Sequence, residues 1–364
     1  MRGLAGNLML AAASLLVTLG LIEVALWTMP VVEVARTQTL ARDGKPFDVS
    51  SKISASVTYS DGWAFRNPQT KRTNNFGFFS RHDYLRGADA VLAIGDSYTE
   101  AAQVSFGQTF HQIAARRIGR PVYNFGLSGA PLSQYEAYLE QACEMFRPRA
   151  AAFAIIHNDF DESFRGWRAR DGFFHYDDSP PHALTPTPYD ISMLRRIATQ
   201  SSLVRYLFFN LHLRSYIRQF TSGSAATHSV SIAFSGASNA PAAIKRAGID
   251  RFLDGVATYC LPKTRIIFLL DTDREAIYAG VSRRDENMMY FRSAAKARGF
   301  ITVDLHDAFA RTYMRDARRF DAITDPHWNA RGHALVGQAL VTALRTIPDI
   351  AKSSQTSALD ALAE

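Results

Sequence analysis

The chain has 364 residues, with 41 Lys and Arg against 34 Asp and Glu, so its formal net charge is +7. This length allows one large domain or two small ones. Hydrophobic residues make up 47% and charged residues 21%, which excludes a disordered chain, a collagen-like repeat and a polytopic membrane protein. The two cysteines, Cys143 and Cys260, exclude a disulfide framework and an all-cysteine zinc site, and they can form one bridge or none.

An apolar segment from Leu8 to Met29 lies near the N-terminus and contains one ionisable residue, Glu23. It is long enough to cross a membrane as a helix, and it lacks the small-x-small cleavage site of a signal peptide. We expect an uncleaved anchor over residues 1–29, with a cleaved signal peptide as the alternative. Arg2 favours a cytoplasmic N-terminus and a body on the periplasmic or extracellular side. Glu23 is costly inside the span, so it either reaches the interface or contacts a partner helix.

Residues 30–62 show little periodicity and are interpreted as a stalk. Beyond them, apolar runs alternate with helical patterns, which predicts a mostly parallel sheet with helices on both faces. Ligands of such sheets bind at the carboxyl ends of the strands. The predicted strands are 90–94, 121–125, 151–156, 265–270 and 300–304, and the predicted helices are 109–117, 132–146, 244–259, 285–298 and 330–345.

The alternation stops between residues 163 and 251, which predicts an insert within one domain that spans residues 63–350. The insert contains a Pro-rich piece, an amphipathic helix over 191–220 and a flexible loop rich in Ser, Ala, Thr and Gly. It has eleven Lys and Arg against five Asp, so it holds nearly all of the positive excess. Its helix is expected to cover the functional site or pack on the domain, or else to lie on anionic headgroups. Residues 351–364 are interpreted as a flexible tail.

Chemically distinctive residues follow the first three predicted strands. Ser97, in a Gly-Asp-Ser turn, occupies the position that a nucleophilic serine needs, near backbone N–H donors. Gly126 ends the second strand, where a glycine allows its N–H to approach a ligand closely. Asn158 follows the third strand, where its side-chain amide can donate to an oxyanion. Taken singly, each also fits a helix cap or a turn.

A histidine follows the last predicted strand, in the segment Asp325-Pro326-His327-Trp328. In an extended segment Asp325 projects to the same side as His327, so it can hold the imidazole in one tautomer. Asp321 is the alternative acid. His333 has no comparable carboxylate nearby and is interpreted as structural. No histidine cluster accompanies the acidic residues after the third strand, so neither a metal site nor a cofactor is predicted.

Together these residues resemble the SGNH (GDSL-type) hydrolase family, in its membrane-anchored bacterial branch, over roughly residues 74–344. The resemblance implies a flavodoxin-like three-layer αβα fold. It implies that Ser97 is the nucleophile, His327 the general base and Asp325 the acid that orients the histidine. It also implies an oxyanion hole made of the Ser97 N–H, the Gly126 N–H and the Asn158 side chain.

The resemblance and the anchor imply a serine esterase that removes small O-acyl groups, foremost acetyl, from a cell-envelope carbohydrate. An alternative is an O-acyltransferase that acetylates an extracellular polysaccharide with the same triad, beside an integral membrane acyl donor. The Asp-Pro-His-Trp segment and the anchor favour that alternative. A third hypothesis, a non-catalytic glycan-binding or assembly subunit, is disfavoured by the intact Ser97, Asn158 and His327. The positive charge comes without a recognised nucleic-acid motif, which argues against nucleic-acid binding.

Overall fold

One parallel sheet of five strands forms the centre of the molecule. The computed structural model describes residues 2–33, 53–160, 162–167, 172–187, 193–213, 241–260, 264–281, 283–323 and 326–351. The strands run in the order β4-β3-β5-β8-β9, which is the flavodoxin-like order and confirms the expected fold class. Their bounds are β3 Val91–Gly95, β4 Val122–Gly126, β5 Ala150–Ile155, β8 Arg265–Leu270 and β9 Ile301–Asp304.

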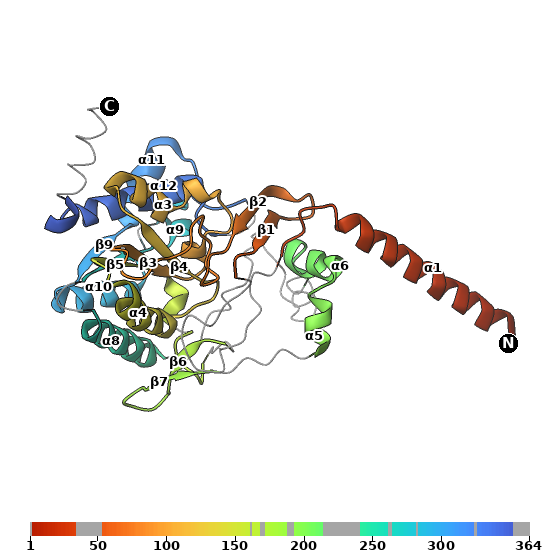
Figure 1. Cartoon of the computed structure of the whole chain (residues 1–364), viewed down its shortest axis with the longest axis horizontal. Coiled ribbons are helices and arrows are strands. Elements are labelled where there is room, and N and C mark those ends of the chain that lie inside the picture. The colour runs from red at the N-terminus through yellow and green to blue at the C-terminus, as the bar shows by residue number, and fades with distance from the viewer. Residues whose placement is uncertain are drawn as a thin grey trace.

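Helices cover both faces of this sheet (Figure 1). Side chains alternate between the faces of a strand, so Leu92 and Ile94 of β3 enter one core cluster whereas Val91 and Ala93 enter the other. Every predicted strand and helix of the sheet region is present within two residues of its predicted ends. One face carries α4 Leu132–Phe146, α8 Ala242–Thr258 and α10 Glu286–Ala297, and the other carries α3 Phe110–Ile118, α11 His306–Asp316 and α12 Ala330–Leu344.

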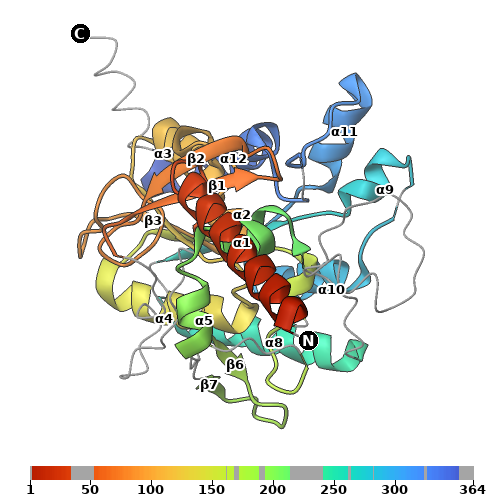
Figure 2. The same ribbon diagram turned by 90° about the vertical axis from the view of Figure 1, so that its right-hand side faces the viewer.

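The N-terminal segment forms one long helix, α1 Arg2–Leu26, which projects away from the domain (Figures 1 and 2). The segment of residues 4–26 is long and apolar enough to cross a membrane. Its most apolar stretch is not buried against the rest of the protein. The predicted stalk lies partly outside the described residues. Part of it forms regular structure, because β1 Ser56–Asp61 pairs antiparallel with β2 Arg66–Arg72.

The predicted helix over residues 191–220 is wrong. The described part contains α5 Met193–Ala198, α6 Ser202–Arg205 and a π-helical turn, η4 Tyr206–Asn210, which continues α6. The reason is local: the Ser201 hydroxyl accepts from the Val204 N–H at 3.2 Å and starts a new helix. The remainder of the predicted helix and the Ser- and Ala-rich loop before residue 241 lie outside the described residues, as does most of the predicted tail.

The insert is less separate from the domain than its composition predicts. It contains a short hairpin, β6 Phe174–Tyr176 with β7 Leu184–Pro186, and its Phe164 and Tyr176 belong to the core cluster around α4 and α8. The Tyr176 hydroxyl donates to Glu136 of α4 at 2.6 Å. The predicted end of the insert, at residue 251, falls inside α8 Ala242–Thr258.

A disulfide joins the two helices α4 and α8. Cys143 lies in the last turn of α4 and Cys260 follows α8, with Cα atoms 5.3 Å apart, within the range that a disulfide requires. The two residues are 117 positions apart in the chain, which is why the sequence left their pairing open.

Candidate active site

Ser97 lies at the carboxyl end of β3, where a short helix, α2 Ser97–Glu100, begins. The Asp96 carboxylate caps this helix by accepting from the Tyr98 N–H at 2.9 Å. A side chain at Gly95 would collide with Thr99, so the close turn from strand to helix requires glycine there. Ser97 remains partly exposed while its neighbours are buried, which leaves its hydroxyl accessible at the edge of the sheet.

His327 reaches the same point from the far end of the chain. Its Nε2 lies 2.7 Å from the Ser97 Oγ, the distance of a hydrogen bond. The Tyr98 ring lies against the imidazole, with centroids 4.7 Å apart, and the Ala322 N–H donates to the His327 carbonyl at 2.7 Å. The structure therefore joins the predicted nucleophile and the predicted base.

The acid of the predicted triad cannot be placed in the same way. Asp325 lies outside the described residues. The alternative, Asp321, accepts from the Arg274 Nε at 2.8 Å. Its carboxylate is therefore bound to an arginine, and it stands at the base of the turn that carries His327, where it forms a bridge to Trp328.

Arg274 holds this turn against the rest of the site. It is 6% exposed and begins α9 Arg274–Tyr278. Its guanidinium donates to both oxygens of Asp271, at 2.7 and 2.6 Å, and to the Pro326 carbonyl. The Tyr98 hydroxyl also donates to the Pro326 carbonyl, at 2.9 Å. The residue directly before His327 is thus fixed by both a guanidinium and a phenol.

Arg274 was not predicted from the sequence, although a signal was present. Asp271 directly follows the buried strand β8, so the same argument that selected Ser97, Gly126 and Asn158 applies to the segment after this strand. A buried Asp-Arg pair at the carboxyl edge of the sheet is a site candidate on that ground.

Gly126 does not match its predicted role. Its N–H donates to the Asn124 side-chain oxygen at 2.8 Å and is therefore occupied. A Cβ at this position would collide with the backbone of Glu100. This glycine is needed because α2 packs directly against β4, and the expectation that its N–H faces an oxyanion is corrected.

The loop after β4 offers another donor. The backbone N–H groups of Leu127, Ser128 and Ala130 donate to Gly95, Glu100 and Leu127, respectively. Among the described residues, the Gly129 N–H has no acceptor. Gly129 has φ +78°, a left-handed conformation that a glycine adopts without strain.

Asn158 lies where the sequence predicts, in a 3-10 turn, His157–Phe160, directly after β5. It is partly exposed, and no acceptor or donor in the described structure is bound to its side chain. Because β3 lies between β4 and β5, the segments that carry Ser97, Gly129 and Asn158 follow three neighbouring strands at one edge. The Ser97 N–H likewise has no acceptor among the described residues.

Buried carboxyl groups lie beneath Ser97. Burial raises the pKa of Asp96 to about 7, against a smaller lowering effect of the Tyr98 N–H and of His327. Burial also raises the pKa of Asp159 well above its usual range, and the nearby Asp96 adds to the effect. Asp159 accepts from the Ile156 N–H at 2.8 Å and from the Tyr135 hydroxyl at 3.1 Å. Ser97 therefore directly follows a buried carboxyl group, that of Asp96, whose pKa lies near neutral pH.

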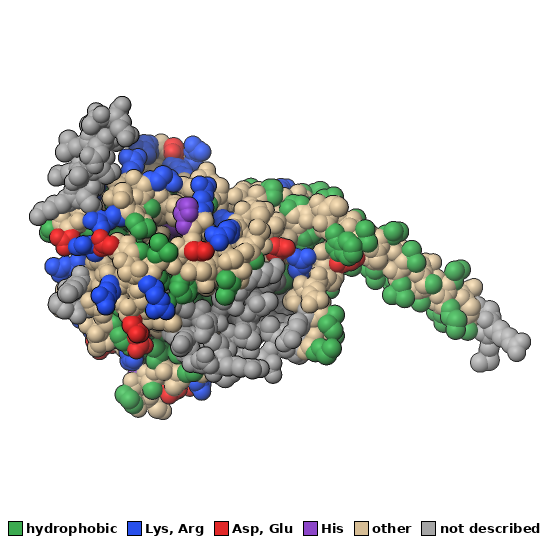
Figure 3. Space-filling view, in the orientation of Figure 1, with side chains coloured by type: hydrophobic (Ala, Val, Ile, Leu, Met, Phe, Trp, Pro, Cys, Tyr) green, Lys and Arg blue, Asp and Glu red, His purple; other side chains and the backbone are tan. Residues whose placement is uncertain are grey.

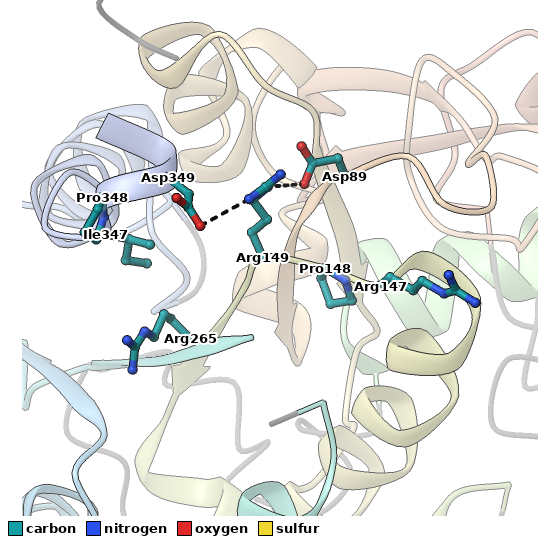
Figure 4. Close-up of a pocket in the computed structure, with 8 residues that line it drawn as sticks. All are labelled: Asp89, Arg147, Pro148, Arg149, Arg265, Ile347, Pro348 and Asp349. Atoms are coloured by element: carbon teal, nitrogen blue, oxygen red, sulfur yellow. Dashed lines mark hydrogen bonds and ion pairs between the residues drawn. The ribbon is translucent and has the colours of Figure 1, made fainter. Parts of the chain in front are cut away.

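Other features lie away from this edge. His333 is buried and its Nδ1 accepts from the Phe110 N–H at 3.3 Å, in keeping with the structural role expected of it. A surface pocket around Asp89, Arg149 and Asp349 lies at the amino ends of the strands, on the opposite side of the sheet (Figure 4). In the described ranges, no group of three or more His, Cys, Asp and Glu side chains is arranged to hold a metal ion.

The chain matches one known protein family. Residues 93–335, two thirds of the chain, match the model of the GDSL-like Lipase/Acylhydrolase family. No curated protein matches the chain.

Several solved structures are similar. A putative GDSL-like lipase from Parabacteroides merdae is 16% identical, with 71% of this chain and 97% of that chain covered and a TM-score of 0.40. An α/β hydrolase, LAE5, from the metagenome of Lake Arreo is 16% identical, with 71% of this chain and 96% of that chain covered and a TM-score of 0.39. An acetyl xylan esterase variant from Geobacillus stearothermophilus is 12% identical, with 71% of this chain and 95% of that chain covered and a TM-score of 0.39.

Proposed function

Because the chain belongs to the GDSL-like lipase/acylhydrolase family, we propose that it is a serine esterase that removes small O-acyl groups, foremost acetyl, from a cell-envelope carbohydrate. The observation that carries the proposal is the 2.7 Å contact between the Ser97 Oγ and the His327 Nε2. This geometry suits removal of the hydroxyl proton as the oxygen attacks a carbonyl.

The proposed reaction has two halves. In the first, His327 takes the Ser97 proton, the Ser97 Oγ attacks the ester carbonyl, and the proton passes to the leaving sugar oxygen as the acyl-enzyme forms. In the second, His327 takes a proton from water, the water oxygen attacks the acyl carbon, and the proton returns to Ser97. Asp325 is proposed to orient the imidazole, as an acid two residues away in an extended segment can do.

For the oxyanion hole we propose the N–H groups of Ser97 and Gly129 together with the Asn158 side chain. These donors have no acceptor among the described residues, whereas the Gly126 N–H already donates to Asn124, and this difference supports the proposal. Donors that are in place before the reaction stabilise the negative oxygen without reorganisation.

We place the catalytic domain on the periplasmic or extracellular side of a membrane, anchored by α1. The pairing of Cys143 with Cys260 supports this side, because disulfides persist in oxidising compartments and are rare in the cytosol. The length and hydropathy of residues 4–26 support the anchor.

The second candidate is an O-acyltransferase, in which a sugar hydroxyl replaces water in the second half-reaction. The anchor favours it, because it holds the acyl-enzyme beside the membrane, where an integral acyl donor would act as partner. Both candidates share every step through the acyl-enzyme, so only the acceptor separates them.

The test uses the full-length protein in detergent with p-nitrophenyl acetate, with and without an oligosaccharide acceptor. We expect acetate release that Ser97→Ala abolishes and that Ser105→Ala, at an exposed serine whose hydroxyl donates to the Gln108 side chain, leaves intact. Release that survives Ser97→Ala would refute both enzymes. Acetylation of the oligosaccharide, faster than hydrolysis, would select the transferase.

A further inference from the structure

Glu23, the single ionisable residue inside the apolar part of α1, is fully engaged by hydrogen bonds. Its carboxylate accepts from the Trp27 Nε1 at 2.9 Å, within α1 itself. It also accepts from the Ser201 hydroxyl, the Ser202 N–H and the Leu203 N–H, each at 2.8 Å. A residue of the anchor therefore caps the N-terminus of a helix that lies almost 180 positions further along the chain.

The helix capped in this way, residues 202–210, is called here the junction helix. Its other end is held as well, because the Asn210 side chain accepts from the Val32 N–H at 3.1 Å and donates to the Ser60 hydroxyl at 3.0 Å. The Tyr206 hydroxyl donates to the Trp63 carbonyl at 3.0 Å. The junction helix is thus fixed between the end of the anchor and the β1–β2 hairpin.

These contacts set the depth of the junction helix relative to a bilayer. Glu23 precedes Leu26, the last residue of the apolar span, by three residues, or about 4.5 Å at 1.5 Å per residue. The N-terminus of the junction helix, which is bonded to Glu23, therefore lies at the level of the last turn of the span. That level corresponds to the boundary between acyl chains and headgroups.

The element directly before the junction helix presents apolar side chains to the surroundings. On α5, Met193 and Leu194 are each 77% exposed and Ile197 is 55% exposed. Figure 1 shows α6 beside the domain end of α1 and α5 below α6, and Figure 3 shows hydrophobic side chains along α1 and at the α5 end of this region. The exposed apolar side chains of α5 thus lie near the end of the domain from which α1 projects, where Trp27 of the N-terminal segment is also 67% exposed.

We propose that α5 and the junction helix form a second membrane contact, which lies in the lipid interface and is clamped by Glu23 to an anchor that stays attached. The partner is the lipid bilayer itself, at the boundary between headgroups and acyl chains, where amphipathic elements bury their apolar side chains. The Glu23 bonds are strong in this poorly hydrated region, since their loss would leave two backbone N–H groups without an acceptor.

The proposal excludes α1 as a removable signal sequence. Cleavage behind the span would remove the cap of the junction helix together with the lipid contact. It also implies that the catalytic domain has one orientation on the membrane, because two contacts at different points restrict rotation about the axis of α1.

Quenching of a fluorescent label by spin-labelled lipid tests the contact. Because both native cysteines are paired, Met193→Cys and Met314→Cys each supply one reactive thiol at equally exposed methionines, 77% and 76%. The full-length variants are labelled with an environment-sensitive fluorophore and reconstituted in phosphatidylethanolamine–phosphatidylglycerol vesicles with nitroxide lipids. We expect the label at residue 193 to be quenched and the label at 314, on α11, to remain unquenched. Equal quenching at both positions would overturn the contact.

Two further arms test the clamp. Glu23→Ala in the Met193→Cys protein should abolish the quenching, whereas Thr18→Ala, whose hydroxyl bonds only within α1, should leave it unchanged. Quenching that survives Glu23→Ala would overturn the clamp. The intact mass of protein from membranes should include α1, and a mature chain that starts behind residue 29 would overturn its retention. Ser97→Ala should leave the quenching unchanged, so failure here is distinct from failure of the proposed chemistry.

Discussion

At the scale of single residues, the site depends on contacts between segments far apart in the chain. Ser97 and His327 are 230 positions apart and meet at 2.7 Å because one follows β3 and the other precedes α12 on the same edge of the sheet. The roles of the individual donors and of Arg274 follow from this geometry and can be tested one side chain at a time.

Asn158→Ala tests the oxyanion hole. Because Asn158 is partly exposed and makes no hydrogen bond to the described structure, we expect its loss to leave stability unchanged. Loss of one oxyanion donor costs about 100- to 1000-fold in kcat. Steady-state kinetics with p-nitrophenyl acetate measure this, with the unfolding midpoint as the control. A variant with wild-type kcat would remove Asn158 from the hole.

Arg274→Ala tests whether the arginine positions His327. The substitution leaves the buried Asp271 without its cation, so we expect a loss of about 3–5 kcal/mol in the free energy of unfolding. We also expect kcat to fall by a larger factor than KM rises. Arg274→Lys should restore stability more fully than kcat, because a single ammonium group cannot make all the hydrogen bonds of the planar guanidinium.

Arg319→Ala is the matched control for Arg274. Arg319 also reaches Asp321, at 3.5 Å, but its side chain is 53% exposed. An exposed ion pair contributes about 0–1 kcal/mol, so stability and kcat should stay near wild type. Equal kcat and stability in Arg274→Ala and Arg319→Ala would contradict the idea that the bond from Arg274 to the Pro326 carbonyl positions His327.

Asp96→Asn tests the buried carboxyl beneath the nucleophile. Burial raises the pKa of Asp96 from 3.8 to about 7, so the folded state binds the proton more tightly than the unfolded state. The resulting stabilisation is complete below about pH 4 and is lost as the pH rises through about 7. Urea titrations between about pH 4 and 7 should show that the free energy of unfolding of the wild type declines with rising pH, and that this decline is smaller in Asp96→Asn. Parallel profiles would contradict the shift.

At the scale of elements, the pairing of helices explains both the disulfide and the breaks in the insert. The helices α4 and α8 lie side by side in one core cluster, which brings Cys143 and Cys260 together. In the insert, Ser201 ends one helical segment and starts the next, and Glu23 of α1 completes the cap. Helix ends here are therefore decided by partners as well as by local sequence.

Replacement of both cysteines by serine tests the disulfide. A crosslink that closes a long loop restricts the unfolded chain, so we expect the variant to lose about 2–4 kcal/mol in free energy of unfolding. Denaturant titration measures this. Alkylation of unreduced protein from membranes is the control, and two reactive thiols there would contradict both the disulfide and the exported location that it supports.

At the scale of the whole molecule, α1, the β1–β2 hairpin and the junction helix meet on the side of the domain from which α1 projects (Figures 1 and 2). The catalytic edge is built from sheet strands and α2, and its hydrogen bonds do not include α1. We therefore expect α1 and the site around Ser97 to be separable in energetic terms.

Deletion of residues 2–29 tests this separation. We expect the shortened protein to keep Ser97-dependent release of p-nitrophenol, because the Ser97–His327 contact is intact. We expect faster tryptic cleavage at Arg205, because the junction helix loses its cap and frays. Limited proteolysis with mass spectrometry reads this out. Unchanged protection at Arg205 would show that the hairpin alone holds the junction helix.

The sequence by itself determined what depends on local pattern. Alternating strand and helix periodicities identified the parallel sheet and its helices, since burial on two faces imposes those periods. Ser97, His327 and Asn158 were recognisable because each follows or borders an element at the carboxyl edge. The assignment of Asp325 remains a prediction, because that residue lies outside the described structure.

Only the tertiary structure decided the contacts between distant segments. The choice between Gly126 and Gly129 depends on which N–H is already occupied, and the role of Arg274 depends on what surrounds its guanidinium. The cysteine pairing and the cap that Glu23 provides join positions more than a hundred residues apart. Such pairings have no periodicity in the sequence, because they arise only when folded elements bring specific donors and acceptors within hydrogen-bond distance.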